Sequence, residues 1–181
     1  KYLNKYVHPT ATLLVDSTTI FNKNGINKIG RNKFYKNKNC TKISLMTDIN
    51  GFPLSIFFFK GNYHDIRTFK NHVKDACILL PNKTKTILAD KAYSSKDIYD
   101  DLQTKNISHI IPPKKNIQLA KTYQNHKQLY AKRIKIEHIF GRIKAIKRIT
   151  NRYDKLLKSF SSFVYLAFAI ISSNIIKNLN L

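Results

Sequence analysis

Acidic side chains are scarce in this sequence, and glutamate occurs only once, as Glu137. The 181 residues include 10 Asp or Glu against 33 Lys or Arg, which gives a formal net charge of +23. Such self-repulsion is tolerable when a polyanion neutralises it, so the composition favours nucleic acid as the partner. A genome rich in A/T codons would also raise the lysine content, but it would not explain the shortage of acids.

Cysteine clusters, a secretory signal and a long hydrophobic run are also lacking. Cys40 and Cys77 form no C-x-x-C motif and no zinc-binding set with the histidines, so we expect reduced thiols. No secretory signal opens the chain, and the apolar stretch from Phe163 to Ile171 is too short to cross a bilayer. We therefore predict a buried helix there and no membrane partner.

The hydrophobic residues, 43% of the chain, are numerous enough to bury the core of one domain over residues 1–181. Their pattern predicts five strands and four helices. We expect the strands at Ala11 to Val15 (with Asp16 at its end), Lys42 to Ile49, Phe52 to Phe59, Thr86 to Ala89 and Ser108 to Ile111. We expect the helices at Ile66 to Leu79, Ser95 to Lys105, about Tyr123 to Ile149, and about Lys155 to Lys177.

Three local signals refine this outline. Asn50-Gly51 predicts a hairpin turn between the second and third strands. Asp65 can cap the helix that follows it. The stretch from Asn22 to Asn39 is rich in Gly, Asn and Lys, which predicts a mobile basic loop or a ragged hairpin. An antiparallel meander that feeds parallel strands with crossover helices gives an α/β fold, a mixed five-stranded sheet with helices on both faces.

Glu137 lies in a pattern of four residue types with fixed spacing, on what we predict to be one helix. Tyr130, Arg133 and Lys144 stand seven and four residues before it and seven after it. At 3.6 residues per turn these offsets place all four side chains on one stripe. A lone acid among three phosphate-seeking side chains is typical of a metal ligand in a DNA groove.

Two aspartates follow apolar strands and complete a set of three acids. Asp16 comes after Leu13-Leu14-Val15, and Asp90 comes after Ile87-Leu88-Ala89. A carboxylate at the end of a buried strand is costly to desolvate unless a cation or a donor satisfies it. Hard oxygen ligands without a Cys or His cluster favour Mg²⁺ or Mn²⁺. The alternative is that each aspartate only caps a turn or a following helix.

With these motifs the sequence resembles the DDE transposases of bacterial insertion sequences and the related PIF/Harbinger nucleases of eukaryotes. The matching segments are Val15-Asp16-Ser17-Thr18, Gly61-Asn62-Tyr63-His64-Asp65, Ala89-Asp90-Lys91-Ala92-Tyr93, and the Tyr130, Arg133, Glu137, Lys144 array. The resemblance runs from about Thr12 to about Asn174. Ala92 departs from it, since many relatives carry glycine there.

The resemblance implies a ribonuclease-H-like fold in which Asp16, Asp90 and Glu137 are the catalytic and metal-binding residues. Two divalent ions about 3.5 to 4 Å apart would then serve an in-line displacement on DNA. Water would free a 3′-hydroxyl at the element's end, and this hydroxyl would attack the target DNA. Two alternatives stay open: an inactive or domesticated transposase-derived DNA-binding protein, and a cellular ribonuclease-H-like nuclease.

Basic residues around the Glu137 helix are candidates for contacts with double-stranded DNA. Arg133 can grip a phosphate with its planar fork, Lys144 can neutralise one, and Tyr130 can stack or donate a hydrogen bond. The alternatives are an ion pair of Arg133 with Glu137 and a core position for Tyr130. We favour a structural role for His64 and Asp65. The other predicted DNA contacts are Lys91, Arg142, Lys147 and Arg148.

Only fifteen residues precede Asp16, too few for a helix-turn-helix. We therefore expect an N-terminal domain that recognises transposon ends to be absent from this chain and supplied by another segment or a separate polypeptide. Homo-oligomers on DNA are also expected. The protein would act in the cytoplasm at the nucleoid of a bacterium, or in the nucleus of a eukaryote.

Overall fold

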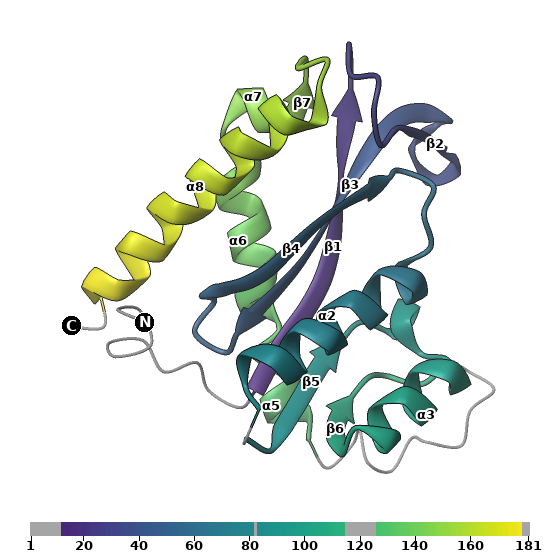
Figure 1. The fold of residues 1–181 in the computed structure, drawn as a ribbon, viewed down its shortest axis with the longest axis vertical. Helices are drawn as coiled ribbons and strands as arrows, with labels where there is room; N and C mark the ends of the chain where they lie inside the picture. The colour runs from purple at the N-terminus through teal and green to yellow at the C-terminus, as the bar shows by residue number, and fades with distance from the viewer. Residues whose placement is uncertain (1–11, 82, 115–125, 179–181) are drawn as a thin grey trace.

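The computed structural model describes residues 12–81, 83–114 and 126–178, which form a mixed sheet with helices on both faces (Figure 1). The sheet order is β2-β3-β1-β5-β6, with β4 also paired to β3 and β7 also paired to β1. The strands are β1 (Thr12–Asn22), β2 (Gly30–Asn32), β3 (Lys38–Asp48), β4 (Pro53–Lys60), β5 (Lys85–Ala89), β6 (Ile107–Ile110) and β7 (Asn151–Arg152). The predicted α/β class is confirmed, but the sheet has seven strands where we predicted five.

Alternating side chains of the strands build two separate cores, one on each face of the sheet. Leu13 and Val15 of β1 pack with Phe69 and Val73 under helix α2 (Asp65–Leu79). Helix α3 (Lys96–Thr104) adds Ile98 and Leu102 to this core, and the 3₁₀ turn η2 (Lys91–Tyr93) adds Tyr93.

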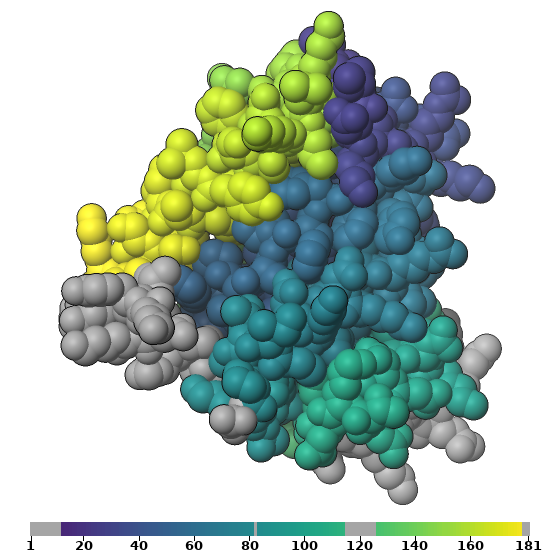
Figure 2. Space-filling model, in the orientation of Figure 1, coloured from purple at the N-terminus to yellow at the C-terminus, as the bar shows by residue number. Residues whose placement is uncertain are grey.

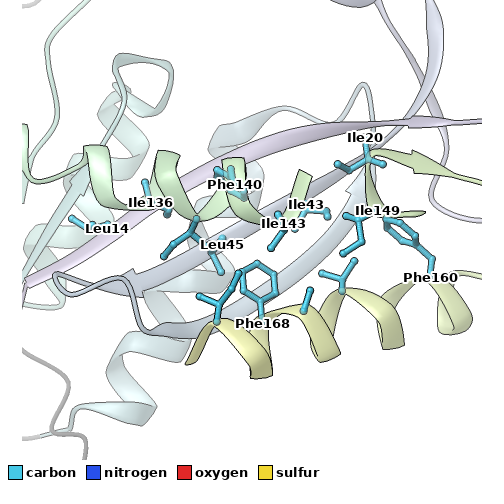
Figure 3. Close-up of a cluster of buried hydrophobic side chains, with 14 of the residues drawn as sticks. Leu14, Ile20, Ile43, Leu45, Ile136, Phe140, Ile143, Ile149, Phe160 and Phe168 are labelled. Atoms are coloured by element: carbon cyan, nitrogen blue, oxygen red, sulfur yellow. The ribbon is translucent and has the colours of Figure 1, made fainter. Parts of the chain in front are cut away.

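The opposite face carries the larger core, which Figure 3 shows between the strands and two helices. Leu14 and Ile20 of β1 meet Ile136 and Ile143 of α6 (Ile134–Lys144), and Phe160 of α8 (Leu157–Asn178) closes the cluster. The short helices α5 (Lys127–Ala131) and α7 (Lys147–Thr150) precede and follow α6. Burial on both faces explains the continuous apolar run Leu13-Leu14-Val15 at the start of β1.

The hairpin between β3 and β4 forms where Asn50-Gly51 predicted it. The strands pair antiparallel, and Gly51 has a φ of 90°, a conformation that favours glycine. The buried carboxylate of Asp48 accepts hydrogen bonds from the backbone N–H groups of Asn50 (2.9 Å) and Phe52 (2.7 Å). This side chain closes the turn and fixes the register of the two strands.

Two sequence predictions about elements are wrong in detail, and one is confirmed. Of the two forms expected for Asn22 to Asn39, the hairpin is present, because Gly30–Asn32 (β2) pairs antiparallel with Lys38–Cys40 of β3 around the 3₁₀ turn η1 (Lys33–Tyr35). Asp16 does not end the first strand, because β1 continues to Asn22 through pairing with β3. The long helix expected up to Ile149 is divided into α5, α6 and α7, because neither junction continues the regular α-helical hydrogen bonding.

Helix α8 (Leu157–Asn178) confirms the final helix that we predicted at about Lys155 to Lys177. Among the described residues it is the one helix whose length and composition would suffice to cross a membrane. Within its apolar 18-residue segment, 28% of the residues are buried. Phe160, Val164, Phe168 and Ile171 lie at helical spacing and pack into the core. Figure 2 shows the rest of the helix along the surface of the molecule.

Candidate active site

Asp16 and Asp90 lie side by side because β1 and β5 run parallel. The last paired residues of the two strands are Val15 and Ala89, so each aspartate is the next residue on its strand. Burial raises the pKa of the Asp16 carboxyl, the nearby Arg133 guanidinium lowers it, and the negative charge of Asp90 raises it again. These two acids, distant from each other in the sequence, therefore share one electrostatic environment.

The edge of β1 is open at this position. β5 pairs with β1 up to Val15, and β7 pairs with it only at Phe21 and Asn22. Within the described residues no strand covers that edge from Asp16 to Ile20. Residues 16–19 are partly exposed there, whereas Ile20 is buried in the core. The backbone N–H of Lys91 donates to the Asp90 carboxylate, which caps η2 at the margin of this opening.

Glu137 reaches the same opening from α6. Ile136 and Ile139 of this helix are buried in the core, and this turns Glu137, whose side chain is 50% exposed, toward the open edge. The Arg133 guanidinium donates through Nη1 to Asp16 Oδ2 at 2.8 Å and through Nη2 to Glu137 Oε1. One cation, 117 residues after Asp16 in the sequence, therefore joins two of the three predicted acids.

The stripe predicted around Glu137 is only partly formed. Lys132, Arg133 and Ile136 each donate a backbone hydrogen bond to the carbonyl three residues earlier, so the chain between α5 and α6 is wound more tightly than an α-helix. Tyr130 is half-buried against the core, while the Arg133 guanidinium lies 6.0 Å from its ring centroid. Tyr130 therefore contacts the core on one side and lies near Arg133 on the other.

The ion pair weighed as the alternative for Arg133 is present, because Arg133 pairs with Glu137 and also with Asp16. Lys144 stands seven residues after Glu137 on the same face of α6. Burial lowers the pKa of the Lys144 ammonium. Its Nζ makes no ion pair with any residue that the structure describes, so its charge is available to a ligand.

The remaining predicted DNA contacts divide between the opening and other surfaces. Lys91 is exposed next to Asp90, and Lys147 is exposed on α7. Arg142 lies away from the acids, in a hollow that it shares with Lys135 and His138 on another face of α6. Arg148 pairs with Asp154 at 2.7 Å and is held 3.6 Å above the Phe163 ring. The structure therefore does not gather all these cations around one point.

A second polar network behind Asp16 was not expected from the sequence. The Ser17 hydroxyl donates to Asp65 Oδ1 at 2.6 Å, and the buried Lys42 ammonium donates to the same oxygen at 2.8 Å. Lys42 also donates to the Tyr63 carbonyl at 2.7 Å.

This network corrects the prediction that Asp65 caps a helix. His64 occupies the N-cap position of α2 without a side-chain cap bond, and Asp65 is the first helical residue. A lysine within a predicted strand was the available signal, because a buried ammonium requires an acidic partner. The sequence alone did not indicate which acid would pair with Lys42.

The acids can be tested as ligands for a divalent cation. The described residues contain no group of three or more Asp, Glu, His or Cys side chains already close enough to hold a metal ion. Asp16 and Glu137 nevertheless converge on one positive group, the Arg133 guanidinium, and Asp90 adjoins Asp16. Three carboxylates are the donors that Mg²⁺ and Mn²⁺ prefer, so the donor set fits, provided that Arg133 moves aside.

Comparison with solved structures defines the class of the fold. The structure is similar to a piggyBac transposase in a synaptic complex with hairpin DNA, with a TM-score of 0.69 and 10% identity over 95% of this chain and 48% of that chain. It is also similar to the catalytic domain of the Mos1 mariner transposase, with a TM-score of 0.53 and 13% identity over 93% and 74% of the two chains. The predicted ribonuclease-H-like fold is therefore confirmed. The chain spans about half the length of the piggyBac transposase chain.

The sequence itself shows to which family the chain belongs. The family described as "Transposase DDE domain" matches residues 8–172, and the chain belongs to this family. No curated protein matches the sequence. Family membership confirms the resemblance stated from the sequence motifs, and nothing in the comparisons favours the domesticated DNA-binding protein or the cellular nuclease.

Proposed function

We propose that this domain is the catalytic core of a transposase, an endonuclease and strand transferase that cuts DNA at transposon ends and joins the freed 3′-hydroxyl to target DNA. Asp16, Asp90 and Glu137 are its catalytic residues. The observations that support the proposal are the position of Asp90 next to Asp16 on parallel strands and the Arg133 guanidinium that joins Asp16 to Glu137 of α6. Membership of the transposase DDE family supports the same conclusion.

Asp16, Asp90 and Glu137 would hold two divalent ions, Mg²⁺ or Mn²⁺. Such ions activate the attacking oxygen and stabilise the leaving oxygen of a phosphodiester displacement. Arg133 keeps the Asp16 and Glu137 carboxylates near each other before DNA binds. When DNA binds, the Arg133 guanidinium forms an ion pair with a phosphate instead. It is a positioning residue in the first state and a DNA contact in the second.

The open edge of β1 determines how DNA can approach. A phosphate that enters there meets Asp16 and Asp90 on the sheet, with Lys91 exposed next to Asp90. Lys144, half-buried and without an ion pair among the described residues, neutralises a phosphate farther along α6. The net charge of +23 supplies general attraction to the backbone, which should weaken steeply with salt.

The experiment is a cleavage assay with the purified chain, Mg²⁺ or Mn²⁺, and labelled duplexes that carry the DNA flanking its gene. We expect nicks that leave 3′-hydroxyl ends, and joined products when target DNA is added. Chelation of the metal should abolish both products. Asp16→Asn, Asp90→Asn and Glu137→Gln should each lower the cutting rate by at least about a hundredfold, because each removes one charged ligand.

Asp100→Asn is the matched control, since Asp100 is exposed on α3, away from the opening. It should cut as the unmodified chain does. Cutting that survives in all three acid variants would overturn the assignment of the site. Cutting without any joined product would instead favour a nuclease over a transposase.

A further inference from the structure

A second groove lies on the sheet face opposite α6, between η1 and the connection from β4 to α2. It has a volume of about 560 Å³, and its lining includes Arg31, Lys33, Phe34, Lys42, Tyr63 and His64. Ser17 also lines it, and Ser17 is the residue after Asp16. Neither the family match nor the predicted DNA contacts assign a role to this groove.

The most unusual wall of the groove is the ring of Phe34, which is 95% exposed. Its neighbour Tyr35 packs edge-on against Phe21, with ring centroids 5.5 Å apart. Phe34 makes no aromatic or cation contact with the described residues. A fully exposed phenyl ring gains nothing from folding, so a partner with a flat apolar face is the natural way to cover it.

The turn that carries Phe34 is fixed in place. The buried Asn32 side chain accepts a hydrogen bond from the Phe34 N–H at 3.0 Å and donates one to the Gly61 carbonyl at 3.0 Å. Gly30 lies so close to the opposite rim that a Cβ there would be 2.1 Å from the Asn62 side chain. The ring is therefore held at the groove, and covering it costs little ordering of the backbone.

Two exposed cations flank the ring, Arg31 before it and Lys33 next to it. Within the described part of the chain neither is in an ion pair, whereas Lys42 at the floor is paired with Asp65. Cations beside an exposed aromatic ring are the pattern that binds single-stranded nucleic acid, with phosphates on the cations and a base on the ring. Bases within a duplex cover each other's faces, so the ring requires a base that is unpaired or at an end.

The groove adjoins the candidate active site. Successive residues of a strand point to opposite faces, so Asp16 faces α6 and Ser17 faces the groove. The edge of β1 between the two faces is open from Asp16 onward among the described strands. A DNA strand can therefore cross this edge with one phosphate at the acids and a nucleotide farther along in the groove.

We propose that the groove between η1 and the β4–α2 connection binds an unpaired nucleotide of DNA, with the base stacked on Phe34 and the adjoining phosphates on Arg31 and Lys33. The proposal rests on the proposed function for the identity of the polymer as DNA. It adds a site for an exposed base beside the cleavage site. Such a base would be present at a single-stranded overhang.

The test uses a property of the sequence, which contains no tryptophan. Phe34→Trp introduces a single indole, whose fluorescence is quenched when a base stacks on it. Tyr165→Trp is the matched control, because Tyr165 is 50% exposed on α8, away from the groove. The titrations use a single-stranded oligonucleotide, a duplex with a single-stranded overhang, a blunt duplex, and a dumbbell duplex closed at both ends.

We expect saturable quenching of Phe34→Trp by the single strand and the overhang duplex, and little by the dumbbell. Quenching by the blunt duplex but not by the dumbbell would show that the ring stacks on a terminal base pair. That result would overturn the proposal that the groove binds an unpaired nucleotide. Equal quenching of Phe34→Trp by all four DNAs, or equal quenching of both tryptophans, would indicate contact through charge alone. Either result would overturn the proposal.

A second variant measures the energetics. Phe34→Ala should weaken binding of the overhang duplex by about tenfold or more, the usual effect of losing one base stack, and leave dumbbell binding and the melting temperature unchanged. Lys33→Ala should also weaken binding of the overhang duplex more than binding of the dumbbell, because Lys33 holds a phosphate next to the stacked base. All titrations are made in chelator, so they do not depend on cleavage. A chain that binds as expected but does not cut would refute the proposed catalysis and leave the groove assigned.

Discussion

Arg133 donates to Asp16 across 2.8 Å, although the two residues are 117 positions apart in the sequence. The same guanidinium donates to Glu137, so this arginine connects α6 to the centre of the sheet. Its side chain is 15% exposed and that of Asp16 is 18% exposed. Solvent therefore screens this contact less than it screens a surface ion pair.

Arg133→Lys tests whether the shape of the guanidinium matters beyond its charge. A lysine is a point charge and cannot donate to Asp16 and Glu137 through two arms of a planar fork. We expect the variant to lose about 1 kcal/mol of unfolding free energy in urea and to cut DNA at least about tenfold more slowly. Arg142→Lys, exposed and outside the opening, is the control and should change neither quantity. Normal cutting by Arg133→Lys would show that charge alone suffices.

Lys42→Met tests the network behind the active site. The variant leaves the Asp65 carboxylate partly buried with only Ser17 as its side-chain donor, so we expect a loss of about 3 kcal/mol in urea denaturation. Adding Asp65→Asn should recover part of that loss, because the amide carries no charge. The control is Lys105→Met, which removes an ion pair with Asp101 at the surface and should cost under about 1 kcal/mol. Equal losses at the two lysines would contradict a structural role for Lys42.

His72 predicts a dependence of stability on pH. It is fully buried between two serine hydroxyls, with Ser55 Oγ 2.6 Å from Nδ1 and Ser44 Oγ 2.8 Å from Nε2. Burial lowers its pKa from 6.5 to about 3. Below pH 6.5 the unfolded chain binds a proton at this residue and the folded chain does not, so the unfolding free energy falls as the pH falls toward 3.

The expected slope is about 1.4 kcal/mol per pH unit between pH 6 and pH 4. His72→Gln removes the titrating group, so the difference in urea denaturation between the two proteins should shrink as the pH falls. This comparison cancels the contribution of the carboxylates, which titrate in both proteins. A difference that stays constant from pH 7.5 to pH 4.5 would mean that His72 is protonated in the folded state.

Arg152 is completely buried and ties three parts of the chain together. Its Nη1 donates to the Asn27 carbonyl at 2.7 Å and to the Thr41 hydroxyl at 2.9 Å, and its Nη2 donates to the Lys155 carbonyl at 3.2 Å. Arg152→Met removes these bonds and takes this donor from the Asn27 carbonyl and the Thr41 hydroxyl, whereas the Lys155 carbonyl keeps its bond from the Ile26 N–H. We expect a loss of more than about 3 kcal/mol, measured by urea denaturation. A loss below about 1 kcal/mol would contradict this account.

The pattern of apolar residues sufficed to predict the main elements, because both faces of β1 and β3 are buried and the helices have clear apolar stripes. Asp16, Asp90 and Glu137 could be selected because acids are rare and each follows or interrupts an apolar pattern. Their proximity could not be derived from periodicity, since it depends on the parallel register that sets Val15 beside Ala89. The resemblance to a family supplied that step.

Other features depend on contacts that sequence spacing does not encode. The β2 strand exists because Gly30–Asn32 finds a free segment of β3, and Gly and Asn carry little strand propensity of their own. The division of the long helix follows from packing, since Arg133 turns inward to Asp16. Asp65 was predicted as a cap because local chemistry favours that role, and the distant Lys42 outweighs it.

The interrupted pairing along β1 has a consequence for motion. β1 pairs with β5 before the interruption and with β7 after it. Along its opposite edge it pairs with β3 from Leu13 to Phe21. The interval from Asp16 to Ile20 is thus a window framed by rigid pairing, which cannot widen by fraying from an end. Backbone amides that face the window should exchange with solvent quickly, and those on both sides of it slowly, so nucleic acid would meet a gap of constant width.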